Sequence, residues 1–200
     1  MLSQRARIIL AFAALASFIT VGAASWVIFG NSTPHASAEG AACREKPQQL
    51  NNLQLATTPR PLPDAVLLKD GTIEIALTEY AGRALVMNFW ATWCAPCIRE
   101  MPALNRLSAG ASSSVVVLPV SQDREGGPIV RKFLDVNKLT NLPALIDPKG
   151  QLARALKVTN LPTTVLFSRQ GREIGRLVGI AEWDQAEVRR YLRRCLNARR

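Results

Sequence analysis

The chain has 200 residues, 48% of them hydrophobic and 20% charged, and it carries a formal net charge of +10. This composition suits one globular domain of ordinary size with an appendage, and it leaves no room for a second domain of similar size.

An uncharged apolar segment lies near the N-terminus. Residues 8–29 run for 22 residues without a charge, and at about 1.5 Å per residue a helix of this length spans roughly 33 Å, the thickness of a bilayer core. Arg5 and Arg7 precede the segment, and no Lys or Arg follows it before Arg44. This asymmetry places residues 1–7 in the cytoplasm. We therefore predict a single transmembrane anchor at 8–29 in the inner membrane, with the rest of the chain in the periplasm.

Two other interpretations of this end also export the domain. The sequence HASA at residues 35–38 offers an Ala-x-Ala-like cleavage site, although the apolar region of a secretory signal runs only about 7 to 15 residues. Lipid attachment at Cys43 is the second, but Cys43 lies well beyond the apolar run.

The polar and proline-containing stretch at 30–60 is predicted to be a linker, and the folded domain is predicted at 61–200. From residue 61 strand-sized apolar runs alternate with helical ones, which is typical of an α/β domain. We expect strands at 65–68, 72–75, 84–89, 115–120, 144–146, 163–167 and 173–178, and helices at 96–107, 128–136, 151–156 and 184–196. The first two strands and the last two should form hairpins. Pro119 should mark a bulge or the end of its strand, and Asp184 should cap the last helix.

Cys94 and Cys97 follow the apolar strand at 84–89 and precede a helix with Pro96 in its first turn. At a helix N-terminus the first sulfur is stabilised as a thiolate, which makes Cys94 the expected nucleophile. Cys97 lies one turn further on, so it can attack a mixed disulfide formed at Cys94 and release the reduced partner. Trp93 should supply a flat apolar wall beside the thiol. A purely structural disulfide is the alternative.

The other two cysteines, Cys43 and Cys195, are 152 positions apart. A four-cysteine zinc site needs two closely spaced pairs, and the second pair is absent. In an oxidising compartment two distant cysteines more often join each other, so we predict a structural Cys43–Cys195 disulfide. Two unpaired thiols are the alternative.

The motif VMNFWATWCAPCIREMP at 86–102, together with NLPTT at 160–164, resembles the membrane-anchored periplasmic thioredoxin-like proteins of the TlpA and ResA type, TlpA above all. The resemblance covers about residues 60–197. It implies a thioredoxin-like fold with an N-terminal β-hairpin and a central inserted β/α unit at about 121–159. It also implies a cis Leu161–Pro162 peptide facing the cysteines. The substrate groove would then be shaped by Trp93, Ala95, Pro96, Leu161 and Pro162.

The same resemblance gives meaning to two polar residues. Asn88 stands where thioredoxin has a buried Asp, so the usual proton acceptor beneath the second cysteine is missing. Glu100 matches an acidic residue that the ResA type keeps near its active site, and we hypothesise that it helps to deprotonate Cys97. The other interpretation of Glu100 is a solvated helix carboxylate.

These features predict a thiol:disulfide oxidoreductase that needs no cofactor. We expect a reductant, because Cys94-Ala95-Pro96-Cys97 lacks the His that the strongly oxidising relatives carry by resemblance. The resemblance implies substrates in respiratory cytochrome assembly: a copper-site Cys pair of an oxidase assembly factor or subunit, or apocytochrome c. Electrons would come from a membrane thiol reductase.

Other functions stay open. The two sulfurs could hold Cu(I) as a chaperone module, but the only histidine is His35 in the linker, so the distal His of Sco-type chaperones is missing. An oxidant of exported proteins is a second alternative and a peroxidase a third, although the cysteine spacing resembles that of disulfide exchangers.

Export argues against nucleic acid as the partner of the basic C-terminal end. That end is a solvated helix face, or it attracts anionic lipid or an acidic partner; its residues are Arg189, Arg190, Arg193, Arg194, Arg199 and Arg200.

Overall fold

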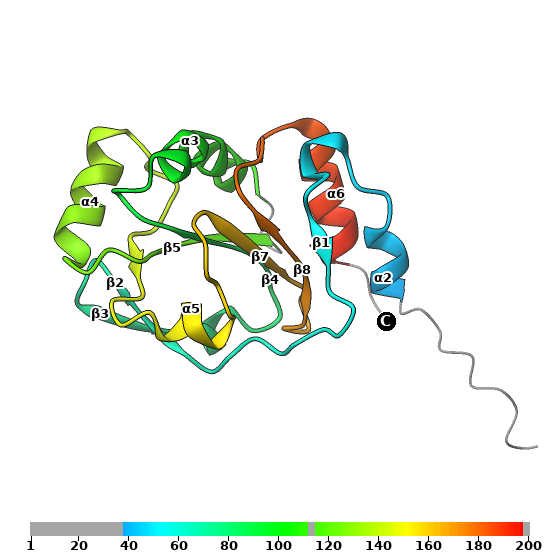
Figure 1. Ribbon diagram of the computed structural model, residues 1–200, viewed down its shortest axis with the longest axis horizontal. Coiled ribbons are helices and arrows are strands. Elements are labelled where there is room, and N and C mark those ends of the chain that lie inside the picture. The colour runs from blue at the N-terminus through cyan, green and yellow to red at the C-terminus, as the bar shows by residue number, and fades with distance from the viewer. Residues whose placement is uncertain (1–37, 112–114, 198–200) are drawn as a thin grey trace, which may run out of the picture. The chain divides into compact units, whose positions relative to one another are not determined.

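The computed structural model describes residues 38–111 and 115–197. The predicted anchor at 8–29 lies outside these residues, and within them no helix is both long and apolar enough to cross a membrane. Strands and helices alternate along the described chain, and one sheet with helices on both faces results (Figure 1). This confirms the predicted thioredoxin-like α/β fold.

The sheet has eight strands in the order β1-β8-β7-β4-β5-β6-β2-β3. Their bounds are β1 Gln54–Leu55, β2 Val66–Lys69, β3 Ile73–Ala76, β4 Ala84–Trp90, β5 Val115–Ser121, β6 Leu145–Ile146, β7 Thr163–Phe167 and β8 Glu173–Val178. The central strand β4 pairs in parallel with β5 and antiparallel with β7. The carboxyl ends of β4 and β5 therefore meet the start of β7 at one edge of the sheet. The motif cysteines follow β4 at this edge.

The helices are α2 Ala38–Cys43, α3 Ala95–Ala109, α4 Gly127–Val136, α5 Gln151–Ala155 and α6 Ala186–Leu196, with 3-10 turns at Gln48–Leu50 and Leu77–Tyr80. Side chains alternate along a strand, so Val86 and Trp90 of β4 join the core under α3, α4 and α6. Leu85, Met87 and Phe89 point to the opposite core, which α5 covers. Figure 1 shows α3 and α4 on one side of the sheet and α5 on the other.

Two details of the sequence prediction are wrong. Pro119 neither ends nor bulges its strand, because it lies inside β5 in register with Asn88. Strand β6 pairs only with the two residues after Pro119. At Pro119 itself β5 therefore has only β4 beside it, and the backbone N–H that proline lacks is not needed for a second strand. Asp184 does not cap α6, which begins at Ala186 after Gln185. The Asp184 carboxylate instead accepts a hydrogen bond from Arg106 Nε at 2.6 Å.

The predicted linker at 30–60 differs from the structure in its second half. From Ala38 the chain forms α2 and a 3-10 turn, and β1 then pairs with β8. Leu50 and Leu53 are fully buried in the core under α3 and α6. These apolar residues stand singly among polar ones, so they produce no periodic pattern, yet each enters the core. The segment from Ala38 is therefore part of the folded domain.

Candidate functional site

The dithiol lies where β4 ends and α3 begins. Cys94 is the N-cap of α3, and its Sγ accepts a hydrogen bond from the Cys97 backbone N–H at 3.3 Å. The two cysteines form a disulfide with their Cα atoms 5.3 Å apart. Cys94 is 6% exposed, whereas Cys97 is completely buried. An incoming sulfur therefore reaches Cys94 first, and the partial positive charge of the helix N-terminus favours a thiolate there.

The loop before Cys94 is held by a buried carboxylate that sequence reasoning missed. Asp123, 3% exposed, follows β5 at the same edge of the sheet. Its carboxylate accepts hydrogen bonds from the Thr92 backbone N–H at 2.9 Å, the Thr92 hydroxyl at 2.6 Å and the Ser121 hydroxyl at 2.6 Å. Thr92 is two residues before Cys94, so this carboxylate fixes the approach of the chain to the nucleophile.

Replacing Asp123 by Ala should lower both the free energy of unfolding, by about 2 to 4 kcal/mol, and the rate of disulfide exchange. The change leaves the half-buried Thr92 N–H and the two hydroxyls without their acceptor, and each such loss costs up to about 1 to 3 kcal/mol when the group is buried. Asp123→Asn keeps one oxygen at the Thr92 N–H and is the milder control. Urea denaturation and stopped-flow exchange with a small disulfide measure the two effects. Equal exchange rates for Asp123→Ala and the wild type would show that the loop does not need this carboxylate.

Glu100 and Asn88 form a second buried network beneath α3. Glu100 is 3% exposed, so the interpretation as a solvated carboxylate is wrong. Its Oε1 accepts a hydrogen bond from Asn88 Nδ2 at 2.9 Å, and its Oε2 accepts from Trp183 Nε1 at 2.7 Å and from the Ala181 N–H at 3.2 Å. Asn88 Nδ2 also donates to Thr164 Oγ1 at 2.9 Å. The network joins α3, β4, β7 and the loop before α6.

Burial raises the pKa of Glu100, and this effect outweighs the three hydrogen bonds from Trp183, Asn88 and Ala181, which lower it. A raised pKa brings a carboxylate closer to the range in which it can exchange a proton with a thiol. Cys97 and Glu100 are three residues apart on α3 and therefore lie on the same side of the helix. The Glu100 carboxylate of α3 is bound by Asn88 of β4.

The raised pKa of Glu100 also predicts a dependence of stability on pH. The folded state favours the neutral carboxyl, so this contribution is complete below the ordinary pKa of Glu and is lost as the pH rises through the raised pKa. Glu100→Gln cannot ionise. Its hydrogen-bonding defect is the same at every pH. The wild type should therefore lose stability relative to the variant over the range that begins at the ordinary pKa of Glu and extends upward through the raised pKa of Glu100. Urea denaturation of both proteins across this range measures the difference, and a difference that does not change with pH would contradict the assignment.

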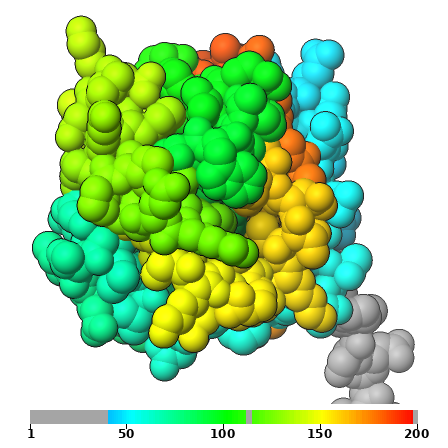
Figure 2. Space-filling model, turned by 60° about the vertical axis from the view of Figure 1, so that its left-hand side comes forward, coloured from blue at the N-terminus to red at the C-terminus, as the bar shows by residue number. Residues whose placement is uncertain are grey.

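The structure describes all of the residues that are predicted to shape a substrate groove. Trp93 is 70% exposed and Ala95 is also exposed. The Leu161–Pro162 peptide is cis, which confirms that expectation. Thr163, the next residue, pairs with Phe89 near the end of β4. Figure 2 shows the start of α3 in green beside the yellow and orange chain that leads into β7. The start of β7 therefore lies beside the end of β4, from which the chain leads to Cys94.

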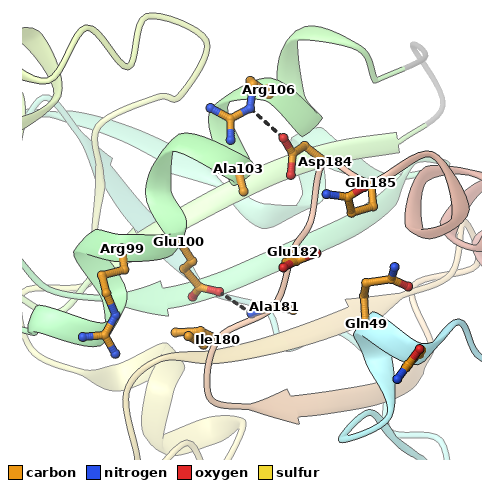
Figure 3. Close-up of a pocket in the computed structure, with 11 residues that line it drawn as sticks. Gln49, Arg99, Glu100, Ala103, Arg106, Ile180, Ala181, Glu182, Asp184 and Gln185 are labelled. Carbon is orange, nitrogen blue, oxygen red and sulfur yellow. Dashed lines mark hydrogen bonds and ion pairs between the residues drawn. The ribbon is translucent and has the colours of Figure 1, made fainter.

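A cleft of about 780 Å³ runs along α3 on the side of Glu100. Figure 3 shows Arg99, Glu100, Ala103 and Arg106 of α3 on one side, and the loop from Ile180 to Gln185 facing them. Gln48 and Gln49, from the segment predicted to be a linker, also line the cleft, and Figure 3 shows Gln49 on the side away from Arg99.

The remaining two cysteines form the predicted disulfide, with the Cα atoms of Cys43 and Cys195 4.7 Å apart and both residues buried. The Tyr191 hydroxyl donates to the Cys43 carbonyl oxygen at 3.0 Å, and burial raises the pKa of Tyr191 to about 12. This disulfide is remote in sequence from the motif pair and fastens the start of the described chain to α6.

The sequence profile of the AhpC/TSA family matches residues 59–172, which include β4, the dithiol, α3 and the Leu161–Pro162 peptide. The chain belongs to the AhpC/TSA family. Within that family it is similar to the thiol-disulfide oxidoreductase ResA of Geobacillus kaustophilus, with 38% identity over 130 residues, 65% of this chain and 73% of that protein. ResA of Geobacillus thermodenitrificans is 38% identical over 110 residues, 55% of this chain and 63% of that protein. The latter match thus covers less than two thirds of that relative.

Solved structures agree with this family. StoA of Bacillus subtilis superposes with a TM-score of 0.53 and 26% identity over 66% of this chain and 98% of that one. The exposed lipoprotein thioredoxin of Streptococcus pneumoniae superposes with a TM-score of 0.55 and 25% identity over 61% of this chain and 93% of that one. The AhpC/TSA domain described here is accordingly a thioredoxin-like thiol-disulfide oxidoreductase of the TlpA/ResA type.

Sequence reasoning missed three residues of the site: Asp123, Thr164 and Trp183. Asp123 had a usable signal, because it is an acidic residue just after a strand parallel to β4. Trp183 had none, since it lies in a loop 83 positions from the Glu100 carboxylate that it binds.

Proposed function

We propose that this protein is a reductant of protein disulfides on the outer side of the inner membrane. The observation that carries the exchange chemistry is the asymmetry of the dithiol: Cys94, at the N-terminus of α3 after the exposed Trp93, is 6% exposed, whereas Cys97 is completely buried. The direction, reduction of the partner, rests on the absence of His between Cys94 and Cys97. A buried second cysteine reacts with Cys94 in preference to a sulfur of another protein. This is the arrangement that disulfide exchange through a mixed disulfide requires.

The proposed reaction runs in two steps. The Cys94 thiolate attacks one sulfur of the substrate disulfide, and the other substrate sulfur leaves as a thiolate. The Cys97 thiolate then attacks Cys94 Sγ, forms the Cys94–Cys97 disulfide and releases the second substrate sulfur. The substrate gains two electrons and the protein loses two. A dithiol donor must restore them, and we assign this role to a membrane thiol reductase.

Glu100 is the proposed acceptor of the Cys97 proton. Its raised pKa, its burial and its place three residues after Cys97 support this role. Asn88 cannot take up a proton; its Nδ2 donates to Glu100 Oε1 at 2.9 Å and so orients the carboxyl group. Glu100 alone would accept the proton when Cys97 loses it for the second step.

The proposed substrates are cysteine pairs of respiratory cytochrome assembly, either the copper-site pair of an oxidase assembly factor or subunit, or apocytochrome c. The similarity to TlpA and ResA supports this class. Location in the periplasm, with the predicted span at 8–29 as anchor, is part of the same proposal and rests on the charge asymmetry of the N-terminal segment.

Electron transfer from the reduced full-length chain to two oxidised peptides tests the proposal. One peptide carries a copper-site Cys-x-x-x-Cys pair and the other an apocytochrome Cys-x-x-Cys-His pair, and alkylation followed by mass measurement counts the thiols formed. We expect at least one peptide to be reduced faster than by an equal concentration of dithiothreitol. The proposal fails if neither peptide is reduced while the oxidised chain readily oxidises their reduced forms, because the protein would then be an oxidant.

A further inference from the structure

Helix α6 presents a basic side to solvent. Arg190, Arg193 and Arg194 are exposed, and at spacings of three and four residues they are neighbours on the helix surface. The opposite side of the helix packs into the core through Val188, Tyr191, Leu192, Cys195 and Leu196. The three arginines therefore form one ridge, called the α6 ridge below, on the outer side of the helix.

The segment that follows α2 adds charge beside this ridge. Residues 45–47 line a small pocket of about 190 Å³ together with Glu187, Arg190, Tyr191 and Arg194 of α6. The exposed charged residues of 44–47 and 187–194 comprise two acidic and five basic ones, which are Glu45, Glu187, Arg44, Lys46, Arg190, Arg193 and Arg194. This surface is therefore clearly positive.

Both carboxylates of this surface already face an arginine of the ridge. Glu187 Oε1 lies 3.5 Å from an Arg190 nitrogen, and Glu45 Oε2 lies 3.8 Å from an Arg194 nitrogen. The Arg190 side chain is nevertheless 68% exposed. Arg193 forms no ion pair with any residue in the described part of the chain. The positive excess is thus left without a balancing carboxylate among residues 38–111 and 115–197.

The chain enters the domain beside the α6 ridge. Eight residues, 30–37, separate the predicted anchor at 8–29 from Ala38, where α2 begins. At about 3.6 Å per residue, a connection of this length reaches roughly 29 Å at most. The Cys43–Cys195 disulfide bonds the end of α2 to α6, and Figure 1 shows the two helices side by side, at the end of the sheet opposite to α4. An anchored chain therefore holds α6 close to the bilayer.

We propose that the α6 ridge docks the domain onto anionic lipid head groups of the membrane that holds the anchor. The inference rests on the proposed location, with the span at 8–29 as anchor. Near an anionic surface each Arg strengthens binding by about fivefold, the equivalent of about 1 kcal/mol. The short connection makes these weak attractions act together, because it keeps the ridge at a high effective concentration near the lipid. Docking through the outer side of α6 sets the orientation of the domain and leaves Cys94, at the start of α3, outside the contact.

Reaction of the arginines with phenylglyoxal tests this docking in the full-length chain. The chain is reconstituted into vesicles of phosphatidylcholine alone, or of phosphatidylcholine and phosphatidylglycerol in equal parts, and mass mapping of peptides gives the rate for each arginine. We expect Arg190 and Arg193 to react about fivefold more slowly in the anionic vesicles. High salt should remove this difference. Arg154, exposed on α5 across the sheet, is the internal reference.

Two double variants make the same change of charge at different places. Arg190→Glu with Arg193→Glu should abolish the docking, so that Arg194 reacts equally fast in both kinds of vesicle, whereas in the wild type it is slowed by the anionic lipid. Lys132→Glu with Lys149→Glu changes exposed residues of α4 and of the turn before α5. This matched control should keep the protection of Arg190 and Arg193.

Flotation of the same samples at high salt separates docking from anchoring. A chain that floats with both kinds of vesicle, but whose Arg190 and Arg193 react equally fast in both at low salt, would overturn the docking alone. The ridge would then belong to solvent or to an acidic protein. A chain that floats with neither kind of vesicle would overturn the proposed anchor and this inference together. Reduction of a peptide disulfide by the same samples tests the proposed reductase activity separately.

Discussion

Cys97→Ser is expected to accumulate a covalent complex between this protein and its substrate, whereas Cys94→Ser is expected to abolish exchange. In the first variant the Cys94 thiolate still attacks the substrate disulfide, but no second sulfur is present to release it. In the second variant the buried Cys97 cannot replace the accessible nucleophile. Loss of the covalent intermediate should lower the exchange rate of Cys94→Ser by at least about a thousandfold, a magnitude seen when nucleophiles are removed from enzymes.

Non-reducing gels and mass measurement of the Cys97→Ser variant after incubation with an oxidised peptide check this expectation. The adduct should have the summed mass of protein and peptide, and it should disappear on addition of dithiothreitol. Ser108 of α3 keeps both cysteines when it is changed to Ala and loses only an exposed hydrogen bond from its hydroxyl to the Asn141 carbonyl oxygen, so Ser108→Ala is the control variant that should form no lasting adduct. An adduct formed by Cys94→Ser rather than by Cys97→Ser would reverse the assigned roles of the two sulfurs.

Removing the second disulfide should cost the domain much of its stability. The Cys43–Cys195 bridge closes a loop of 152 residues, and in the chain-entropy model a loop of this size contributes about 5 kcal/mol, with about 2 to 4 kcal/mol typical of measured cases. We expect Cys43→Ala with Cys195→Ala to lower the free energy of unfolding by about 3 to 5 kcal/mol. The segment from Ala38 to Leu53 should also become susceptible to proteolysis, because the bridge is its covalent attachment to α6.

Urea denaturation of the double variant with the Cys94–Cys97 pair oxidised measures this loss, and limited proteolysis maps where the chain opens. Leu50→Ala is a useful comparison: it removes a buried side chain of the same segment and should cost about 2 to 5 kcal/mol while leaving the bridge intact. A double variant as stable as the wild type would show that burial of Leu50 and Leu53 alone holds the segment.

The dithiol could be predicted from the sequence because all of its determinants are local. The apolar strand is followed within a few residues by Cys94, Pro96 and Cys97. The same short segment therefore indicates the strand-to-helix turn that favours a thiolate at Cys94. The Cys43–Cys195 bridge followed from counting, since only two cysteines remained. The pairing of strands into a sheet followed from the alternation of apolar runs with helical patterns.

The groups that hold this dithiol could not be read in the same way, because they come from distant positions. Asp123 binds the Thr92 N–H and hydroxyl across 31 positions, and Trp183 binds Glu100 across 83. The groups around Glu100 come together only in the folded chain. The sequence was therefore compatible with two interpretations of Glu100, a solvated carboxylate and a functional one.

The reduction potential of the Cys94–Cys97 pair is the most direct test of the central claim that this protein donates electrons to its substrates. The oxidised and reduced full-length chain would be equilibrated in defined dithiol buffers, quenched and alkylated, and the thiols counted by mass. A value near that of thioredoxin, about −270 mV, or slightly above it, is the result we predict for a reductant fed by a membrane dithiol donor. A value near about −120 mV, as in strong oxidants, would contradict the claim and make the protein an oxidant of exported chains.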